Sequence, residues 1–417
     1  MKAAVLDSVG ELRIEERELS SLRDHDVLVA IRVCGVCRTD RKSFLIGQRD
    51  LHPPRILGHE IAGVVQEVGP QVANHKAGDR VQVYPGIACG SCVNCLAGHD
   101  HLCDEMQIIG FHSDGGFAEY LLVEESVDYP TKPSVLNKLP DNLSFRIASL
   151  AEPVACSLNL LLRMNLDRAK YCVILGAGPL GIITAQLVRA NSSASLAIVE
   201  PHAARRQIAA AFSDAQFDAG GQTIQQLLEF TNGQGADLII PCCPGNEAFQ
   251  LSLQLAAKRA EIGFFSGLTD TSSIPNQLLN TIHYRELSVI GSYGCSSSDV
   301  KGALGLLAAG ALDIDRLPVL DISWDELPGN LADTSAQDHI FTFFWPDISE
   351  ANATSLCTDF GKTMATDVAT ETIGIRPESV SVETSEQEPA HISPNDISAN
   401  AAGFSTLSSL VSKGGKL

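Results

Sequence analysis

The stretch V-I-L-G-A-G-P-L-G at residues 173–181 decides the fold of the second half of this chain. An apolar run ends in Gly176, which permits a tight turn. Gly178 lets the backbone approach a pyrophosphate, and Gly181 allows a helix to pack closely on the preceding strand. The amide groups and the positive dipole end of that helix face the phosphates. The stretch therefore predicts a strand, a turn and a helix that bind a dinucleotide.

Short apolar runs and helical runs alternate around this stretch. Strands are predicted at Cys172–Leu175, Ala197–Val199, Asp237–Ile240, Ala260–Phe265 and Leu287–Ile290, and helices at Leu180–Arg189 and His202–Phe212. Such alternation is typical of a parallel sheet covered by helices on both faces. The second half is therefore expected to be a doubly wound α/β domain.

Glu200 ends the second of these strands, 24 residues after Gly176. A carboxylate there accepts hydrogen bonds from both ribose hydroxyls and repels a 2′-phosphate, so it favours NAD. Arg205 and Arg206 follow closely and favour NADP instead, because they would attract a 2′-phosphate. We give Glu200 the greater weight and predict NAD.

Four cysteines stand close together in C-G-S-C-V-N-C-L-A-G-H-D-H-L-C, at Cys89, Cys92, Cys95 and Cys103. Two-residue gaps bring three thiolates to one ion, and a seven-residue loop returns the fourth. Four thiolates around Zn²⁺ form a closed site with no position for a substrate, so this zinc is expected to be structural. Disulfides or unpaired thiols are the alternative.

Composition limits the classes of partner. The chain has 417 residues and a net charge of −20, which argues against nucleic acid and anionic membranes as partners. No apolar run of about twenty residues predicts a membrane span. The N-terminus lacks a signal-peptide core, and twelve cysteines without one favour a reducing, cytoplasmic location. Residues 371–401 contain few large apolar side chains and predict a disordered, acidic tail.

A second metal set is spread along the first 153 residues. Cys37 follows a predicted strand, His59 lies at a turn, and Glu152 lies near the junction of the two halves. One thiolate, one imidazole and one carboxylate are ligands that zinc accepts, and three ligands leave a fourth position open for chemistry. Each residue alone would more often belong to a surface turn or a helix start. Their order and context indicate a catalytic zinc.

Three features together resemble the zinc-dependent medium-chain dehydrogenases, the alcohol and polyol dehydrogenase family that includes sorbitol dehydrogenase. They are G-H-E-I-A-G-V-V at residues 58–65, the four-cysteine run and the glycine turn at residues 176–181. The resemblance extends from Met1 to about Leu317. It implies a GroES-like, β-rich catalytic domain followed by a Rossmann cofactor domain. The predicted domains are residues 1–152, 153–295, a return segment 296–350 and the tail 351–417.

The resemblance also implies roles for single residues. Cys37, His59 and Glu152 match the catalytic zinc ligands, and Glu152 is a glutamate as in polyol members. Glu60 would lie beside the metal, as an exchanging ligand or just outside the ligand set, and Asp40 would orient His59. Thr39 would take the proton from the alcohol, with Arg38 on the cofactor pyrophosphate and Arg205 on the adenosine ribose. The predicted cofactor-binding residues are Arg38, Gly176, Gly178, Pro179, Leu180, Gly181, Glu200 and Arg205.

The implied activity is zinc-dependent transfer of a hydride between an alcohol or polyol and NAD, with two zinc ions per chain. The implied substrate is a secondary alcohol, including a sugar alcohol or its phosphate. Relatives assemble as homodimers or homotetramers, and Leu287–Ile290 is the candidate edge strand for this contact. After Leu317 the family pattern is not matched. The alternative is therefore a zinc-stabilised NAD-binding protein with an interaction or regulatory role.

Overall fold

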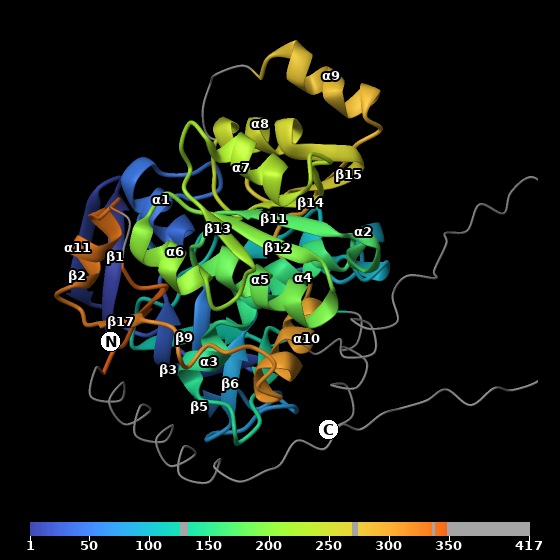
Figure 1. The fold of residues 1–417 in the computed structure, drawn as a ribbon. Coiled ribbons are helices and arrows are strands. Elements are labelled where there is room, and N and C mark those ends of the chain that lie inside the picture. Colours follow the sequence, from blue (N-terminus) through green and yellow to red (C-terminus); the bar gives the residue numbers. More distant parts are fainter. Residues whose placement is uncertain (126–131, 269–273, 336–337, 348–417) are drawn as a thin grey trace, which may run out of the picture.

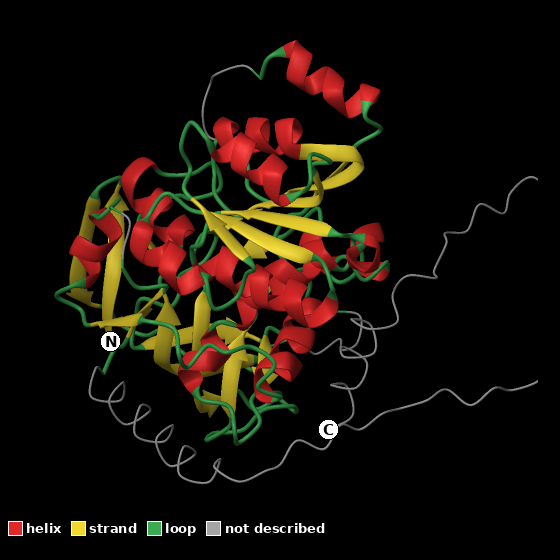
Figure 2. Cartoon of the chain, in the orientation of Figure 1, coloured by secondary structure: helices red, strands yellow, loops and turns green. Residues whose placement is uncertain are grey.

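The structure, a computed structural model, describes residues 1–125, 132–268, 274–335 and 338–347. Figures 1 and 2 show two lobes. One is rich in strands and contains both the start and the last described part of the chain, and the other is a sheet with helices on both faces. This is the α/β architecture that the sequence predicts. The predicted tail at residues 351–417 lies outside the described residues.

The second lobe is built on a six-stranded parallel sheet with the order β13-β12-β11-β14-β15-β16. The chain enters in the middle of the sheet and winds outward in both directions, which confirms the doubly wound prediction. Its strands are β11 (Tyr171–Leu175), β12 (Ser195–Val199), β13 (Ala215–Phe217), β14 (Ala236–Pro241), β15 (Ala256–Phe264) and β16 (Ser288–Gly291). Among the described residues β16 pairs only with β15, so it is the edge strand that the sequence predicts near Leu287–Ile290.

Helices bury both faces of this sheet (Figure 1). They are α4 (Ala151–Leu161), α5 (Pro179–Asn191), α6 (Ala203–Ala209), α7 (Thr223–Phe230), α8 (Asn246–Leu255) and α10 (Ser297–Ala308), with the short helix η2 (Leu166–Arg168). Helix α9 (Asn276–Tyr284) packs on α8 and has no buried residue. Along β11, Cys172 and Ile174 belong to the core formed with α4, α5 and α10. Val173 and Leu175 belong to the core formed with α7 and α8. Successive strand side chains point to opposite faces, so an unbroken apolar run is what this position needs.

Helix α6 is shorter than predicted. The sequence predicts a helix over His202–Phe212, but α6 ends at Ala209. The chain then turns so that Asp214 can pair with β12, where its N–H donates to Leu196 O at 2.8 Å and its carboxylate accepts the Leu196 N–H at 2.8 Å. The need to return to the sheet outweighs the helical propensity of the alanines.

The first lobe contains a seven-stranded sheet, a three-stranded sheet and the pair β7–β8. Its strands are β1 (Lys2–Ser8), β2 (Glu11–Glu16), β3 (Asp26–Gly35), β4 (Arg55–Ile56), β5 (Glu60–Val68), β6 (Arg80–Val83), β7 (Gly86–Ile87), β8 (Gln107–Ile108), β9 (Tyr120–Glu124), β10 (Leu136–Lys138), β17 (Val319–Ile322) and β18 (Phe341–Phe344). Its helices are α1 (Arg38–Ile46), α2 (Val93–Leu96), η1 (Asp100–Leu102), α3 (Phe145–Ser149) and α11 (Leu327–Ala332).

The segment after α10 completes the first lobe. Strand β18 pairs antiparallel with β3, with Phe344 opposite Cys34, and β17 pairs with β18. Helix α11 is bound to α1, because Arg41 donates to Asp333 O at 3.1 Å and to Asn330 Oδ1 at 3.0 Å. The last described residues therefore support the strand and helix that flank Cys37.

The loop between β16 and α10 is held by the first lobe. Tyr84 Oη donates to Cys295 O at 3.1 Å. Asp100, in the four-cysteine loop, accepts the Ser297 N–H with both carboxylate oxygens at 3.1 and 3.2 Å. Since Asp100 is 3% exposed, this contact is shielded from water and fixes the start of α10.

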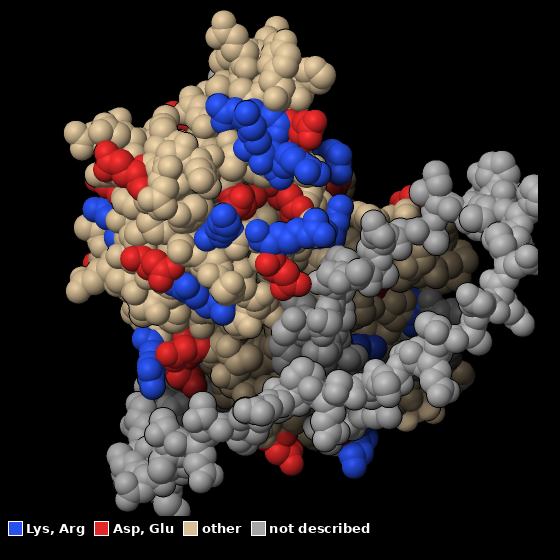
Figure 3. Space-filling view, turned by 45° about the vertical axis from the view of Figure 1, so that its right-hand side comes forward, with Lys and Arg blue, Asp and Glu red and all other residues tan. Residues whose placement is uncertain are grey.

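Two surface properties bear on partners. Within the described residues, no helix combines the length and the apolar composition needed to cross a bilayer. On the face displayed in Figure 3, acidic and basic side chains lie interspersed.

Candidate functional site: two metal-ligand groups and a dinucleotide loop

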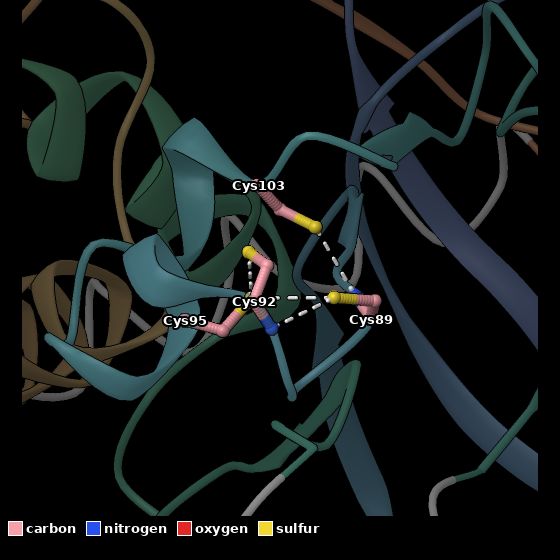
Figure 4. A group of neighbouring side chains, drawn as sticks. All are labelled: Cys89, Cys92, Cys95 and Cys103. Carbon is pink, nitrogen blue, oxygen red and sulfur yellow. Dashed lines mark hydrogen bonds between the residues drawn. The ribbon is translucent and has the colours of Figure 1, made fainter.

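The four cysteines of residues 89–103 come together in one loop (Figure 4). Cys89 follows β7, and Cys103 follows η1. Cys92 is the N-cap residue of α2, and Cys95 lies within that helix. Their sulfur atoms lie within 4.8 Å of one another, with Sγ–Sγ distances of 3.9 Å for Cys89–Cys95 and 3.5 Å for Cys92–Cys95. Four thiolates bound tetrahedrally to zinc lie about 3.8 Å apart. The geometry therefore fits the structural zinc that the spacing predicts.

Backbone amides stabilise the thiolate form of part of this group. The N–H groups of Ser91 and Cys92 donate to Cys89 Sγ at 3.5 and 3.4 Å and lower the pKa of Cys89 to about 6. Backbone hydrogen bonds likewise lower the pKa of Cys92, whereas burial raises the pKa of Cys95 to about 12. A divalent ion would be needed to hold all four as thiolates.

A second group joins Cys37, His59 and Glu60, whose ligand atoms also lie within 4.8 Å of one another. Cys37 is the N-cap residue of α1, and its Sγ accepts the Thr39 N–H at 3.5 Å. Glu60 is the first residue of β5 and His59 directly precedes it, and both are buried, with 6% and 5% exposure. The sequence places all three near the metal, and the structure brings them together.

Asp40 contacts residues of this group and holds them in place. It is fully buried, accepts the Cys37 N–H at 2.9 Å and the Gly58 N–H at 3.2 Å, and its Oδ1 lies 3.3 Å from His59 Nδ1. A carboxylate against Nδ1 fixes the ring and leaves Nε2 for a metal. One side chain thus caps α1, holds the turn at Gly58 and orients the imidazole.

Burial changes the pKa values of all three groups. It raises the pKa of Glu60 to about 8, with repulsion from Glu152 and Asp40 adding to the shift and attraction to His59 opposing it. Burial also raises the pKa of Cys37. For His59 burial acts to lower the pKa, but the Asp40 carboxylate outweighs it and the pKa lies well above its usual value. Buried thiol, imidazole and carboxyl donors at this spacing fit a zinc ion, which would stabilise their ionised forms.

The structure does not bring Glu152 into this group. Glu152 lies in the first turn of α4, where it forms a third group with Cys156 and Cys295, and Cys156 Sγ donates to its Oε1 at 3.2 Å. Its assignment as the third ligand of the catalytic zinc stays a prediction. Sequence reasoning missed Cys156 and Cys295. The i, i+4 spacing of Glu152 and Cys156 was the one available signal.

The predicted dinucleotide loop has the required shape. Gly176 has φ +104°, a conformation that favours glycine. A Cβ at Gly181 would lie 1.9 Å from Gly176 O, so only glycine permits this approach of helix α5 to the turn. Pro179 and Leu180 open α5, and Gly178 is its N-cap residue.

Glu200 lies beside this loop at the end of β12. Its Oε2 accepts the Ala177 N–H at 2.7 Å, and its Oε1 accepts the His202 N–H at 2.9 Å. Arg206 donates from Nη1 to the backbone oxygens of Glu200 and Pro201, both at 2.6 Å. In this structure the guanidinium group of Arg206 is therefore bound to backbone carbonyl groups next to Glu200.

Residues 23–133 match the alcohol dehydrogenase GroES-like domain, and residues 179–309 match the zinc-binding dehydrogenase domain. A crystal structure described as a zinc-binding dehydrogenase from Sinorhizobium meliloti, bound to NADP, is 30% identical with a TM-score of 0.74. The match covers 83% of this chain and 99% of that one. The chain belongs to the zinc-binding alcohol dehydrogenase family.

Other members of the family are also similar. D-xylulose reductase A of Aspergillus oryzae is 28% identical over 333 residues, which cover 77% of this chain and 90% of that protein. The 2R,3R-butanediol dehydrogenase structure from Bacillus subtilis is 26% identical with a TM-score of 0.71, covering 83% of this chain and 99% of that one. Family membership makes this protein an enzyme of the zinc and nicotinamide-cofactor class.

Proposed function

We propose that the protein interconverts a secondary alcohol of a polyol, a sugar alcohol or its phosphate with the corresponding ketone, using NAD and two zinc ions per chain. The convergence of Cys37, His59 and Glu60 within 4.8 Å supports this proposal, because it brings a thiol, an imidazole and a carboxyl group of the types that zinc accepts together beside a hydroxyl group. One relative is named for the reduction of xylulose, which is a ketose, and another is named as a dehydrogenase of butanediol, which is a diol.

The bound groups supply the Lewis acid and the hydride carrier. The residues of the chain position the substrate and move its proton. Thr39 Oγ1 lies 3.6 Å from Cys37 Sγ, so its hydroxyl is next to the ligand group and can accept the proton of the substrate alcohol. Position 42 holds a lysine, so a histidine does not continue the relay there. The proton then passes to a ribose hydroxyl or to water.

Glu200 supports NAD over NADP. Its carboxylate is fixed by two backbone N–H groups at the end of β12, where the adenosine ribose binds in this fold. The NADP bound in the Sinorhizobium meliloti relative favours NADP instead. Changing Glu200→Ala should lower the affinity for NAD and raise that for NADP. An unchanged ratio of the two affinities would contradict the assignment.

The test of function is formation of the reduced nicotinamide with a panel of polyols, polyol phosphates, threonine and simple alcohols. Cys37→Ser should abolish turnover in a folded protein. Cys34→Ala is the matched control, since Cys34 is a buried thiol on β3 outside all three metal groups. Turnover by Cys37→Ser would contradict the mechanism. NAD binding without turnover on any substrate would favour a non-catalytic role.

A further inference from the structure

A third group of metal-ligand types lies beside the proposed catalytic group. It consists of Glu152, Cys156 and Cys295, and their ligand atoms all lie within 4.8 Å of one another. Glu152 and Cys156 are four residues apart on α4, so they share one face of that helix. Cys295 comes from the loop between β16 and α10, and α10 packs on α4. Two elements far apart in the sequence thus bring two thiols and a carboxylate together.

The group is preorganised. Cys156 Sγ lies 3.2 Å from Glu152 Oε1. Cys295 is 5% exposed, and its carbonyl oxygen accepts a hydrogen bond from Tyr84 Oη at 3.1 Å. The next residue, Ser296, caps α10 by accepting the Asp299 N–H at 3.1 Å. The backbone on both sides of Cys295 is therefore fixed, which lowers the entropic cost of ordering a ligand bond.

The chemistry of the donors indicates which ion fits. Thiolate ligands select zinc and related soft ions over calcium and magnesium, which prefer all-oxygen sites. Two thiolates and one carboxylate give three protein ligands and leave a fourth position for water.

We propose that Glu152, Cys156 and Cys295 bind a further zinc ion, separate from the ions of the four-cysteine loop and of Cys37, His59 and Glu60. Binding forms two Zn–S bonds and one Zn–O bond, and the two thiol protons leave to solvent. A carboxylate has two oxygens, so Glu152 can serve this ion through Oε1 and retain its other oxygen for the neighbouring ion. The inference does not depend on turnover.

The experiment measures metal content of the full chain after equilibration with Zn²⁺ and removal of unbound ions. The wild type should hold three zinc ions per chain, and the double variant Cys156→Ala/Cys295→Ala should hold two. Cys172→Ala is the matched control, because Cys172 is a fully buried thiol on β11 outside all three groups, and it should hold three. Two ions in the wild type, or the same number in the wild type and the double variant, would overturn the proposal.

A titration of the metal-free wild type with Co²⁺ keeps the proposal testable if the double variant does not fold. Thiolate-to-cobalt absorption should increase up to the third equivalent. An increase that stops at the second equivalent would overturn the proposal. Three ions without turnover would leave this inference intact while contradicting the proposed function, and turnover with two ions would do the reverse.

Discussion

Asp40→Asn should weaken the catalytic metal site by more than it weakens the fold. Asp40 accepts two backbone N–H groups, at 2.9 and 3.2 Å, and contacts His59 Nδ1 at 3.3 Å, with no exposure to water. Asparagine has one oxygen, so at least one of these donors would face an amide N–H₂. Loss of one hydrogen bond to a buried carboxylate costs about 1.5–3 kcal/mol. A carboxylate that orients a histidine ligand contributes about 10–100-fold in metal affinity.

Asp26→Asn is the matched control. Asp26 is 1% exposed and is the first residue of β3, at the end of the strand that lies away from Cys37. It accepts three hydrogen bonds from Arg23, each at 2.9 Å. Both variants should lose a similar amount of stability to urea. Only Asp40→Asn should lose the catalytic metal at a chelator concentration about 10–100-fold lower than the wild type requires. Equal metal affinity in the two variants would refute the argument that Asp40 acts through the orientation of His59.

Three further predictions concern the glycine turn, Glu60 and the structural zinc. Gly181→Ala should lower the melting temperature, because its Cβ would lie 1.9 Å from Gly176 O. The Cβ of Gly178→Ala would meet only an Arg205 nitrogen, at 3.8 Å, so this variant should keep its stability and lose dinucleotide affinity. Equal melting temperatures of the two variants would contradict the close packing at Gly181. In metal-free protein Glu60, with its pKa raised to about 8, keeps a proton that the unfolded chain releases near the ordinary glutamate pKa of 4.5. Its contribution to stability is therefore full below pH 4.5 and falls as the pH rises to 8, by at most about 1.4 kcal/mol per pH unit. Glu60→Gln should remove this part of the decline in urea unfolding between the two pH values, and an unchanged decline would show that other groups cause it. Cys95→Ser should remove one zinc ion per chain and lower the melting temperature, whereas retention of the ion would mean that three thiolates suffice.

The sequence predicts those parts of the fold and of the site whose residues lie close together along the chain. The cysteines at positions 89–103 lie within one loop, so their spacing alone predicts their meeting. The run Arg80–Val83 alternates polar and apolar side chains between turn residues, which predicts a strand, and β6 has these bounds. The glycine turn at residues 176–181 likewise contains its own strand and helix.

The misses have a common physical cause, which is contact between distant segments. Cys295 meets Cys156 only because α10 packs on α4, and no spacing rule describes that packing. The apolar run Phe117–Val123 predicts a strand, but β9 begins at Tyr120, because Phe117 and Ala118 bond to β1 instead of continuing the pairing of β9 with β3. The apolar, aromatic run Ile340–Trp345 predicts a strand, and Phe341–Phe344 form β18, but the pairing of this strand with β3 is a tertiary property. The predicted domain boundaries and the homodimer or homotetramer remain predictions.

The contact between Asp100 and the start of α10 makes the two metal regions thermodynamically dependent on each other. The four-cysteine loop holds Asp100 in place, and Asp100 in turn holds Ser297, two residues after Cys295. An ion that orders this loop therefore lowers the entropy cost of ordering Cys295, so the ions are expected to bind with positive cooperativity. Because such coupling is reciprocal, occupancy at Cys295 should raise the zinc affinity of the four-cysteine loop by the same free energy. The zinc that takes no part in chemistry would then report, through its affinity, on whether the group of Glu152, Cys156 and Cys295 is occupied.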